Sequence, residues 1–233
     1  MFGLSNLVNS IRNIKIAVDF LKDMGKDTDS VFDLQERLRD TPQMQVCLDR
    51  LKANPAMAQL IAERYMGPDI DLAALKQMPK GSLGYSYATV ITNLGYDPEF
   101  YRDVEIKDDA DYVVMRVRKT HDIHHIVTGF SLKPEGETGV LGMMAAQCGY
   151  PSFTVILLTA LVIAYKKRPE LFNEVLQRVV VGLQIGWSAE LLLAQKWEEG
   201  WEKSLEQWRS ELQINAVTSG PTSWMDTTPG LTL

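Results

Sequence analysis

The central segment of the chain is residues 108–129, DDADYVVMRVRKTHDIHHIVTG. Acidic residues open it and a glycine closes it, which is the pattern of a helix several turns long. The stretch 112–117 could instead be a strand by propensity, because it is rich in β-branched and aromatic residues. No convincing partner strand occurs elsewhere in the sequence, so we expect a helix over 108–129.

The second half of this predicted helix carries all three histidines of the chain, at positions 121, 124 and 125. His121 and His125 are one helical turn apart and Asp122 flanks them, so three candidate metal ligands share one face. Glu137 is separated from His125 by eleven residues and could reach the same point from the next helix. Neutral imidazoles and carboxylates that converge in this way suit a divalent cation.

Zinc is the first choice of metal. Nitrogen and oxygen ligands suit zinc, iron or manganese, whereas magnesium prefers fewer imidazoles. Two alternatives need no catalytic metal: the histidines could be surface or cap residues, with Asp122 hydrogen-bonded to one of them, or a structural metal could lock two helices together. Spacing supplies one ligand pair easily, but a complete site needs a tertiary contact, here from Glu137.

Length and composition are those of a globular protein. The 233 residues are 45% hydrophobic and 23% charged, which suits one buried core, although two domains are compatible with this length. The formal net charge of -6 argues against nucleic acid as the main partner, because phosphate binding needs a basic surface. Cys47 and Cys148 form no closely spaced pair, which argues against a disulfide framework or a thiolate zinc site. With no signal or transit features at the N-terminus, we expect a cytoplasmic protein.

Helix-start signals recur along the chain. Thr41-Pro42 and Asn54-Pro55 each place a capping side chain before a proline at the first helical position, and Ser82 could cap a further helix. The sequence therefore predicts an all-α, multi-helical single domain over residues 1–215, with a metal site between two central helices. Residues 216–233, rich in Thr, Ser, Gly and Pro, are expected to be a disordered tail.

Small residues share one face of the helix expected after Glu137, namely Gly139, Gly142, Ala145 or Ala146, and Gly149. Small side chains let two helix backbones approach closely, and we expect that approach to bring Glu137 to the histidine helix. Helix packing without any metal site would produce the same pattern.

Two segments in the second half of the chain present apolar faces. Residues 153–165 are almost continuously apolar and are followed by Lys166, Lys167 and Arg168, but they fall short of the roughly 20 residues that span a bilayer. A buried core helix is the plain interpretation, with an apolar wall around a lipid or a face resting on a membrane as alternatives. Tryptophans and leucines between 197 and 212 recur at helical spacing, and we expect them to face the core from one helix.

The pattern His121-Asp122-x-x-His125, eleven residues, then Glu137 resembles the signature of the Coq-four family of ubiquinone (coenzyme Q) biosynthesis proteins. Gly136, directly before Glu137, also fits that signature, and no signature position is missing. Supporting features occur in the segments 79–87, 95–98 and 111–118 and in the tryptophan-rich C-terminal region. Together they extend the resemblance over residues 34–214, most of the chain.

The resemblance implies an all-α protein with a divalent metal held by His121, Asp122, His125 and Glu137. It further implies action on an aromatic ring that carries a long isoprenoid tail. Two roles are consistent with it: metal-dependent, oxidative decarboxylation of the ring by a carboxy-lyase, or a non-catalytic prenyl-lipid-binding scaffold that organises a quinone-biosynthesis enzyme complex.

In the enzyme interpretation, Glu137 or Asp122 would shuttle a proton, and Arg116 or Arg118 would hold the substrate carboxylate unless these arginines are solvated helix charges. The isoprenoid tail would need an apolar cleft, for which 153–165 and 185–193 are the candidate walls. The implied location is cytoplasmic and peripheral to the inner membrane, with other quinone-biosynthesis proteins as partners. A homodimer is compatible with the sequence and is not specified by it.

Overall fold

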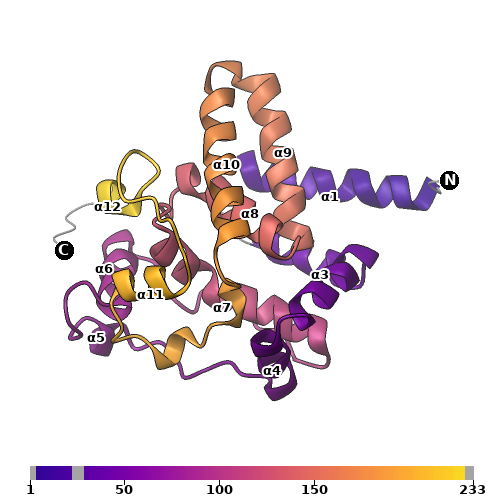
Figure 1. Cartoon of the computed structure of the whole chain (residues 1–233). Helices are drawn as coiled ribbons and strands as arrows, with labels where there is room; N and C mark the ends of the chain where they lie inside the picture. The colour runs from indigo at the N-terminus through magenta and orange to yellow at the C-terminus, as the bar shows by residue number, and fades with distance from the viewer. Residues whose placement is uncertain (1–3, 23–28, 229–233) are drawn as a thin grey trace.

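The computed structural model describes residues 4–22 and 29–228, and in these residues it contains helices and no strand (Figure 1). Two isolated bridges, Ser82 with Ser204 and Phe130 with Ser223, are the β-type contacts within that part of the chain. The all-α prediction is confirmed. The elements are α1 (Leu4–Lys22), α2 (Asp29–Leu38), α3 (Pro42–Lys52), α4 (Pro55–Glu63), α5 (Leu72–Leu75), α6 (Leu83–Leu94), α7 (Asp109–Thr128), α8 (Pro134–Gln147), α9 (Pro151–Lys167), η1 (Pro169–Leu171), α10 (Phe172–Ser188), η2 (Leu192–Ala194), η3 (Trp197–Glu199), α11 (Leu205–Glu211) and α12 (Trp224–Thr227).

Helix α7 runs through the middle of the molecule. Of its 20 residues, 17 are buried, and it packs against helices from both halves of the chain, among them α3, α4, α6, α8 and α11. The side chain of Asp108 caps its start by accepting a hydrogen bond from the Asp111 amide. Gly129 ends it with a φ of 85°, and a Cβ there would clash with the backbone of Val217. The helix predicted over 108–129 is confirmed, and the strand alternative for 112–117 is wrong.

The predicted helix starts are also confirmed, because each capping side chain accepts a backbone hydrogen bond. Thr41 accepts one from the Met44 amide at the start of α3. Asn54 accepts one from the amide three residues on, at the start of α4, and Ser82 does the same for α6. These local signals place three helices of the first half of the chain before any tertiary contact is considered.

Helices α8 and α10 lie unusually close together. A Cβ on Gly182 of α10 would clash with the carbonyl oxygen of Gly139 of α8, and a Cβ on Gly142 would press on the backbone of Val179. The small residues of α8 therefore do allow close backbone packing, as predicted, but their partner is α10. The expected partner, the histidine helix, is wrong, and Glu137 approaches α7 from the first turn of α8 instead.

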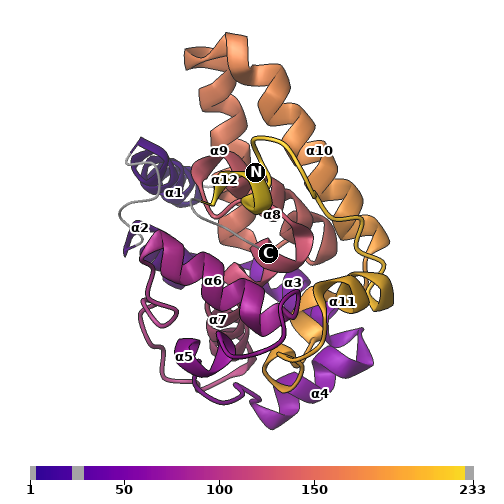
Figure 2. The ribbon, with the colours of Figure 1, turned by 90° about the vertical axis from the view of Figure 1, so that its left-hand side faces the viewer.

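Helices α9 and α10 run side by side and extend beyond the rest of the molecule (Figures 1 and 2). The inner side of α9 packs on α1, α2 and α8. None of the helices in residues 4–22 and 29–228 is long and apolar enough to cross a membrane. The prediction of a buried core helix over 153–165 is only half right, because Phe153, Ile156 and Leu157 are buried whereas the outer face of α9 is exposed.

The C-terminal tryptophans lie in the core, as predicted, but on more than one helix. Trp197 belongs to η3 and Trp208 to α11, and Trp201 lies in the turn between them. All three are buried, and the rings of Trp197 and Trp208 are 4.7 Å apart. The single helix expected over 197–212 is wrong because the chain turns back at Gly200, whose carbonyl accepts the indole N–H of Trp208 at 3.1 Å.

The segment after residue 215 differs from the expected disordered tail as far as the structure describes it. Trp224 of α12 is fully buried and donates its indole N–H to the Ile126 carbonyl at 3.0 Å. The Val217 amide donates to the Thr128 carbonyl at 2.8 Å. These bonds satisfy carbonyls in the last turn of α7, which lack partners within the helix. The end of the expected tail, residues 229–233, lies outside the described residues.

Candidate metal centre

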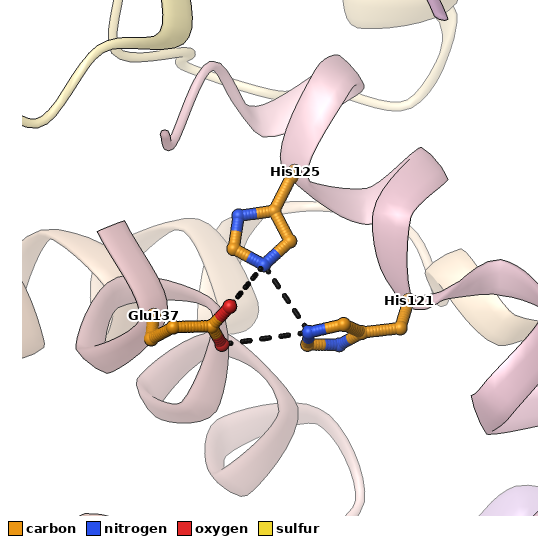
Figure 3. Close-up of side chains that lie close together, drawn as sticks. All are labelled: His121, His125 and Glu137. Atoms are coloured by element: carbon orange, nitrogen blue, oxygen red, sulfur yellow. Dashed lines mark hydrogen bonds and ion pairs between the residues drawn. The ribbon is translucent and has the colours of Figure 1, made fainter. Parts of the chain in front are cut away.

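Three of the four predicted ligands converge on one point between α7 and α8 (Figure 3). The Nε2 atoms of His121 and His125 are 3.2 Å apart. One carboxylate oxygen of Glu137 lies 3.4 Å from Nε2 of His121, and the other lies 3.3 Å from Nε2 of His125. The ligand atoms of these three side chains all lie within 4.8 Å of one another. The tertiary contact that spacing alone could not establish is therefore present.

Local structure explains why the three side chains meet. His121 and His125 are four residues apart on α7 and so project from the same side. After the glycine that ends α7, a short connection leads into α8, whose first turn carries Glu137. The first turn of a helix favours a carboxylate, because the backbone N–H groups there are free and the helix dipole is positive. One short connection thus brings an anionic ligand to a histidine pair.

His125 is oriented by a contact on its other ring nitrogen. Its Nδ1 lies 3.3 Å from the carbonyl oxygen of Phe130. A carbonyl only accepts hydrogen bonds, so Nδ1 donates to it, and in the neutral ring Nε2 is the nitrogen that offers a lone pair to a metal at the centre. This arrangement, in which a backbone carbonyl fixes the tautomer of a histidine, is common for metal ligands.

The donor set fits a divalent metal. Two imidazole nitrogens and one carboxylate are donors that divalent metals such as zinc prefer, and one ligand atom from each of the three side chains lies within 4.8 Å of the others. Two imidazoles and one carboxylate also form a three-ligand set that leaves a coordination position open, which is typical of catalytic zinc.

The centre is closed on one side and open on the other. The side chain of His125 is fully buried, whereas those of His121 and Glu137 are 21% and 33% exposed. Burial works to raise the pKa of Glu137, but His125 and His121 outweigh it and hold this pKa below its usual range. Burial works to lower the pKa of His121, and Glu137 together with Asp122 raises it. The carboxylate is thus ionised where a cation would bind.

Asp122 is not a member of the converging group, although it follows His121 directly. Its side chain is partly exposed, and its pKa is raised by burial, against the opposing influence of His121 and His125. A carboxyl group of this kind retains a proton more readily than an ordinary aspartate. The structure therefore brings together His121, His125 and Glu137 and leaves Asp122 beside them. Its role as a ligand stays a prediction.

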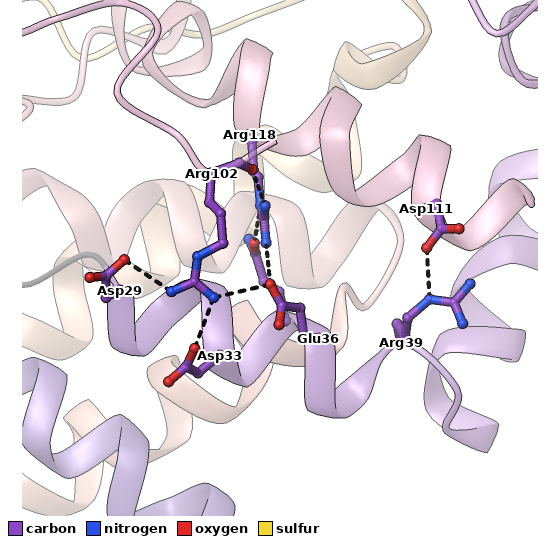
Figure 4. Close-up of polar contacts among 8 residues, drawn as sticks. Asp29, Asp33, Glu36, Arg39, Arg102, Asp111 and Arg118 are labelled. Carbon is purple, nitrogen blue, oxygen red and sulfur yellow. Dashed lines mark hydrogen bonds and ion pairs between the residues drawn. The ribbon is translucent and has the colours of Figure 1, made fainter. Parts of the chain in front are cut away.

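The two predicted substrate arginines have protein partners instead of facing the group of three. Arg116 is fully buried and donates to Glu198 at 2.6 Å and to the Gln195 carbonyl. Arg118 donates from Nε to Gln35 at 2.7 Å and from Nη1 to the Arg102 carbonyl, within a polar cluster that joins α7 to α2 (Figure 4). Substrate binding by either arginine stays a prediction.

Two aromatic side chains extend from the site, and the sequence did not predict their contact with the histidines. The ring of Phe153, in the first turn of α9, stands edge-on to His121 with centroids 5.3 Å apart, and Tyr150 stands edge-on to Phe153 at 5.2 Å. The apolar run from 153 is one candidate wall for the isoprenoid tail, and its first residue borders the site. Nothing in local spacing could show that this residue contacts His121, because the contact is tertiary.

Comparison with known proteins agrees with the all-α fold and with the family that the sequence resembles. The family model described as Coenzyme Q (ubiquinone) biosynthesis protein Coq4 matches residues 21–218. A solved structure from Nostoc punctiforme, of a protein assigned to ubiquinone biosynthesis, is 30% identical with a TM-score of 0.78, covering 88% of this chain and 97% of that one.

Curated relatives include the mitochondrial ubiquinone biosynthesis protein COQ4 homolog of Aedes aegypti, 30% identical over 64% of this chain and 54% of its own length. The mitochondrial COQ4 of Coprinopsis cinerea is 30% identical over 71% of this chain and 58% of its own. The chain thus spans little more than half the length of these relatives. Because the family model covers most of the chain, and a solved structure matches nearly end to end, the chain belongs to the Coq4 family of ubiquinone biosynthesis proteins.

Proposed function

We propose that this protein is a metal-dependent carboxy-lyase that removes the ring carboxyl group from a polyprenylated aromatic intermediate in ubiquinone or prenylquinone biosynthesis. The observation that carries the proposal is the convergence of His121, His125 and Glu137 on one point that is open to solvent on one side. A site with an open position suits a reacting metal better than a structural one, since structural sites are closed by four protein ligands.

His121, His125 and Glu137 would hold the metal, with zinc the first choice and iron, manganese or magnesium as alternatives. When bound, a metal supplies a Lewis acid that accepts the negative charge developing on the ring as carbon dioxide leaves. Other groups of the chain orient these ligands and line the site. The Phe130 carbonyl keeps the His125 lone pair directed at the centre, and Phe153 borders the site with an apolar ring.

A proton must replace the lost carboxyl group if the ring is not hydroxylated in the same step. Loss of carbon dioxide leaves an electron pair on the ring carbon, and an acid donates a proton to it. Asp122 suits this step because its carboxyl group lies beside the site, where burial raises its pKa above that of an ordinary aspartate. Oxidative decarboxylation would require dioxygen as the oxidant, so oxygen consumption separates the two courses.

The substrate's isoprenoid tail would need apolar surface, because each buried methylene contributes about 0.8 kcal/mol. Helix α9 begins at the site and is apolar along most of its length. The second predicted wall, 185–193, is divided between the end of α10 and η2. Since such a tail partitions into bilayers, the proposed location is peripheral to the inner membrane, among other quinone-biosynthesis proteins.

The test is turnover by the purified protein with its metal content measured. A prenylated hydroxybenzoate is supplied with and without oxygen, and carbon dioxide and the ring product are followed by mass spectrometry. We expect metal-dependent product that is lost in Glu137→Ala and retained in Glu135→Ala, a matched change at an exposed glutamate in the same first turn of α8. Absence of product at full metal occupancy would contradict the enzyme proposal.

The exposed apolar face of α9 favours a second candidate, a non-catalytic prenyl-lipid-binding scaffold that organises a quinone-biosynthesis complex. In that case prenylated aromatic compounds would bind tightly and raise the melting temperature, while the metal-loaded protein released no carbon dioxide. A purely structural metal predicts a third result, in which metal removal lowers stability and prenyl lipids do not bind.

A further inference from the structure

One face of α9 exposes large apolar side chains where a soluble helix would carry polar ones. Leu158, Val162 and Tyr165 are 58%, 54% and 66% exposed. They occur at positions i, i+4 and i+7 and so form a single stripe, referred to below as the α9 stripe. Isolated exposed apolar residues are ordinary, but a contiguous stripe of them is typical of a surface that contacts a partner, a ligand or a membrane.

Basic residues continue the helix where the α9 stripe ends. Lys166, Lys167 and Arg168 are all exposed. Arg168 pairs with Glu170 at 2.6 Å, whereas neither lysine forms an ion pair with any residue in the part of the chain that the structure describes. The whole chain has a formal charge of -6. A basic end on an apolar helix face is therefore a local exception on an acidic protein.

The α9 stripe also lies on the part of the molecule best able to reach a flat surface. The α9–α10 hairpin extends away from the remaining helices (Figures 1 and 2). The opposite side of α9 is occupied by α1, α2 and α8. The stripe can therefore contact an outside surface without disturbing the core.

We propose that the α9 stripe, together with Lys166 and Lys167, is a docking surface for an anionic lipid membrane. Apolar side chains would enter the interface, Tyr165 would lie at the headgroup level, and the lysines would contact anionic headgroups. A second copy of the chain fits less well, because α9 contains no Asp or Glu. Self-pairing through this helix would leave the lysines without an acidic partner, whereas anionic lipid supplies one.

The surface deepens the proposed function by naming where the protein meets a membrane. Phe153, in the first turn of α9, contacts His121 of the candidate metal centre, and the stripe begins little more than one turn further along the same helix. An isoprenoid tail that lies along α9 would extend from the bilayer to the candidate metal centre, where the aromatic ring of the substrate would react. Only this last link rests on the proposed function; the membrane contact itself rests on exposure and charge.

The first test is flotation with vesicles in the absence of substrate. Phosphatidylcholine vesicles are compared with vesicles in which a third of the lipid is phosphatidylglycerol, at low and high salt. We expect binding to the anionic vesicles that weakens with salt. The double variant Lys166→Gln/Lys167→Gln should bind about 25-fold more weakly, roughly fivefold for each lysine. Leu158→Gln/Val162→Gln should also lower binding, because less apolar surface enters the interface.

Matched controls are available on other surfaces. Val180 and Trp187 of α10 are 47% and 70% exposed, and Lys76 and Lys80 are exposed lysines far along the chain from α9. We expect Val180→Gln/Trp187→Gln and Lys76→Gln/Lys80→Gln to bind vesicles as the unaltered protein does. Equal binding to both vesicle types, or equal losses in the controls, would overturn the proposal. So would sedimentation showing a dimer that Leu158→Gln/Val162→Gln dissociates, since the stripe would then bind a second copy.

Turnover measured in detergent separates this proposal from the proposed function. With substrate dissolved in micelles, the lysine variant should turn over normally although it binds vesicles about 25-fold more weakly. Conversely, His121→Ala should lose turnover and still float with anionic vesicles. Loss of vesicle binding in His121→Ala would show that the contact depends on the metal centre and would overturn the independent docking surface.

Discussion

Helices α7 and α9 differ in a way that inverts the usual relation between composition and burial. Helix α7 contains three histidines and several charged residues, yet 17 of its 20 residues are buried. Helix α9 contains the longest apolar run of the chain, yet Leu158, Val162 and Tyr165 of that run are exposed. Position in the fold, and not hydropathy alone, decided which helix became the core. The candidate metal centre lies on α7 and the proposed docking surface lies on α9, so each of these two unusual helices carries a site to which we assign function.

Burying the basic side chains of α7 is tolerable because each of them has a partner supplied from elsewhere in the chain. Arg116 pairs with Glu198, and Arg118 with Gln35. Lys119 donates to the Pro68 carbonyl at 3.1 Å. A buried charge without a partner costs several kcal/mol, so these contacts fix α7 in position. Helix α9 has no comparable polar anchors on its outer face, which leaves that face free to bind.

The largest expected effect is loss of metal from α7. His125→Ala should lower bound metal from about one equivalent per chain to less than about a tenth, because the remaining two ligands hold a metal far more weakly. Elemental analysis by mass spectrometry measures this directly, with circular dichroism to confirm that the helices persist. His124→Ala is the matched control, since His124 is buried on the same turn but faces Trp197. Equal metal loss in both variants would place the site elsewhere.

The next effect concerns the buried ion pair of α7. Glu198→Ala leaves the fully buried Arg116 guanidinium without its anion, and we expect the free energy of unfolding to fall by about 3–5 kcal/mol. Urea denaturation provides the measurement. Glu199→Ala is the control at the adjacent exposed glutamate, where a surface contact with Lys196 at 3.6 Å should contribute less than about 1 kcal/mol. Similar losses in both variants would mean that the pair does not anchor α7.

A smaller effect is expected where the C-terminal segment closes the end of α7. Trp224→Phe removes the indole donor from the Ile126 carbonyl and should lower the free energy of unfolding by about 1–3 kcal/mol. Trp187→Phe, at a 70% exposed tryptophan, should change it by less than about 0.5 kcal/mol. Both values come from the same denaturation series. If the segment after residue 215 were disordered, Trp224→Phe would not change the free energy of unfolding. This pair of variants therefore tests whether the segment is packed against α7.

The sequence was sufficient wherever a structural signal is local. Thr41, Asn54 and Ser82 cap the helices that they were expected to cap, and Asp108 and Gly129 bound α7 as predicted. The histidine pair follows from helical spacing, and Glu137 was expected from the helix that follows. Local signals predict these features because capping and helical periodicity depend on neighbours a few residues away.

What could not be predicted depends on the identity of distant partners. Trp224 is buried against α7 and donates to the carbonyl of Ile126, which lies 98 residues earlier in the chain. No pattern within residues 216–228 identifies Ile126 as the partner. The small residues of α8 predict a close helix partner without saying which helix it is. The arginines of α7 were indistinguishable from solvated charges until Glu198 and Gln35 were located beside them.

The smallest effect distinguishes the two sides of α9. Leu158→Ala on the exposed stripe should change the free energy of unfolding by less than about 0.5 kcal/mol, whereas Leu157→Ala, at a neighbour that is 5% exposed, should lower it by about 2–5 kcal/mol. If Leu158→Ala were as destabilising as Leu157→Ala, the outer face of α9 would be covered in solution. It would then belong to the core as the histidine helix does, and the contrast between the two helices would not hold.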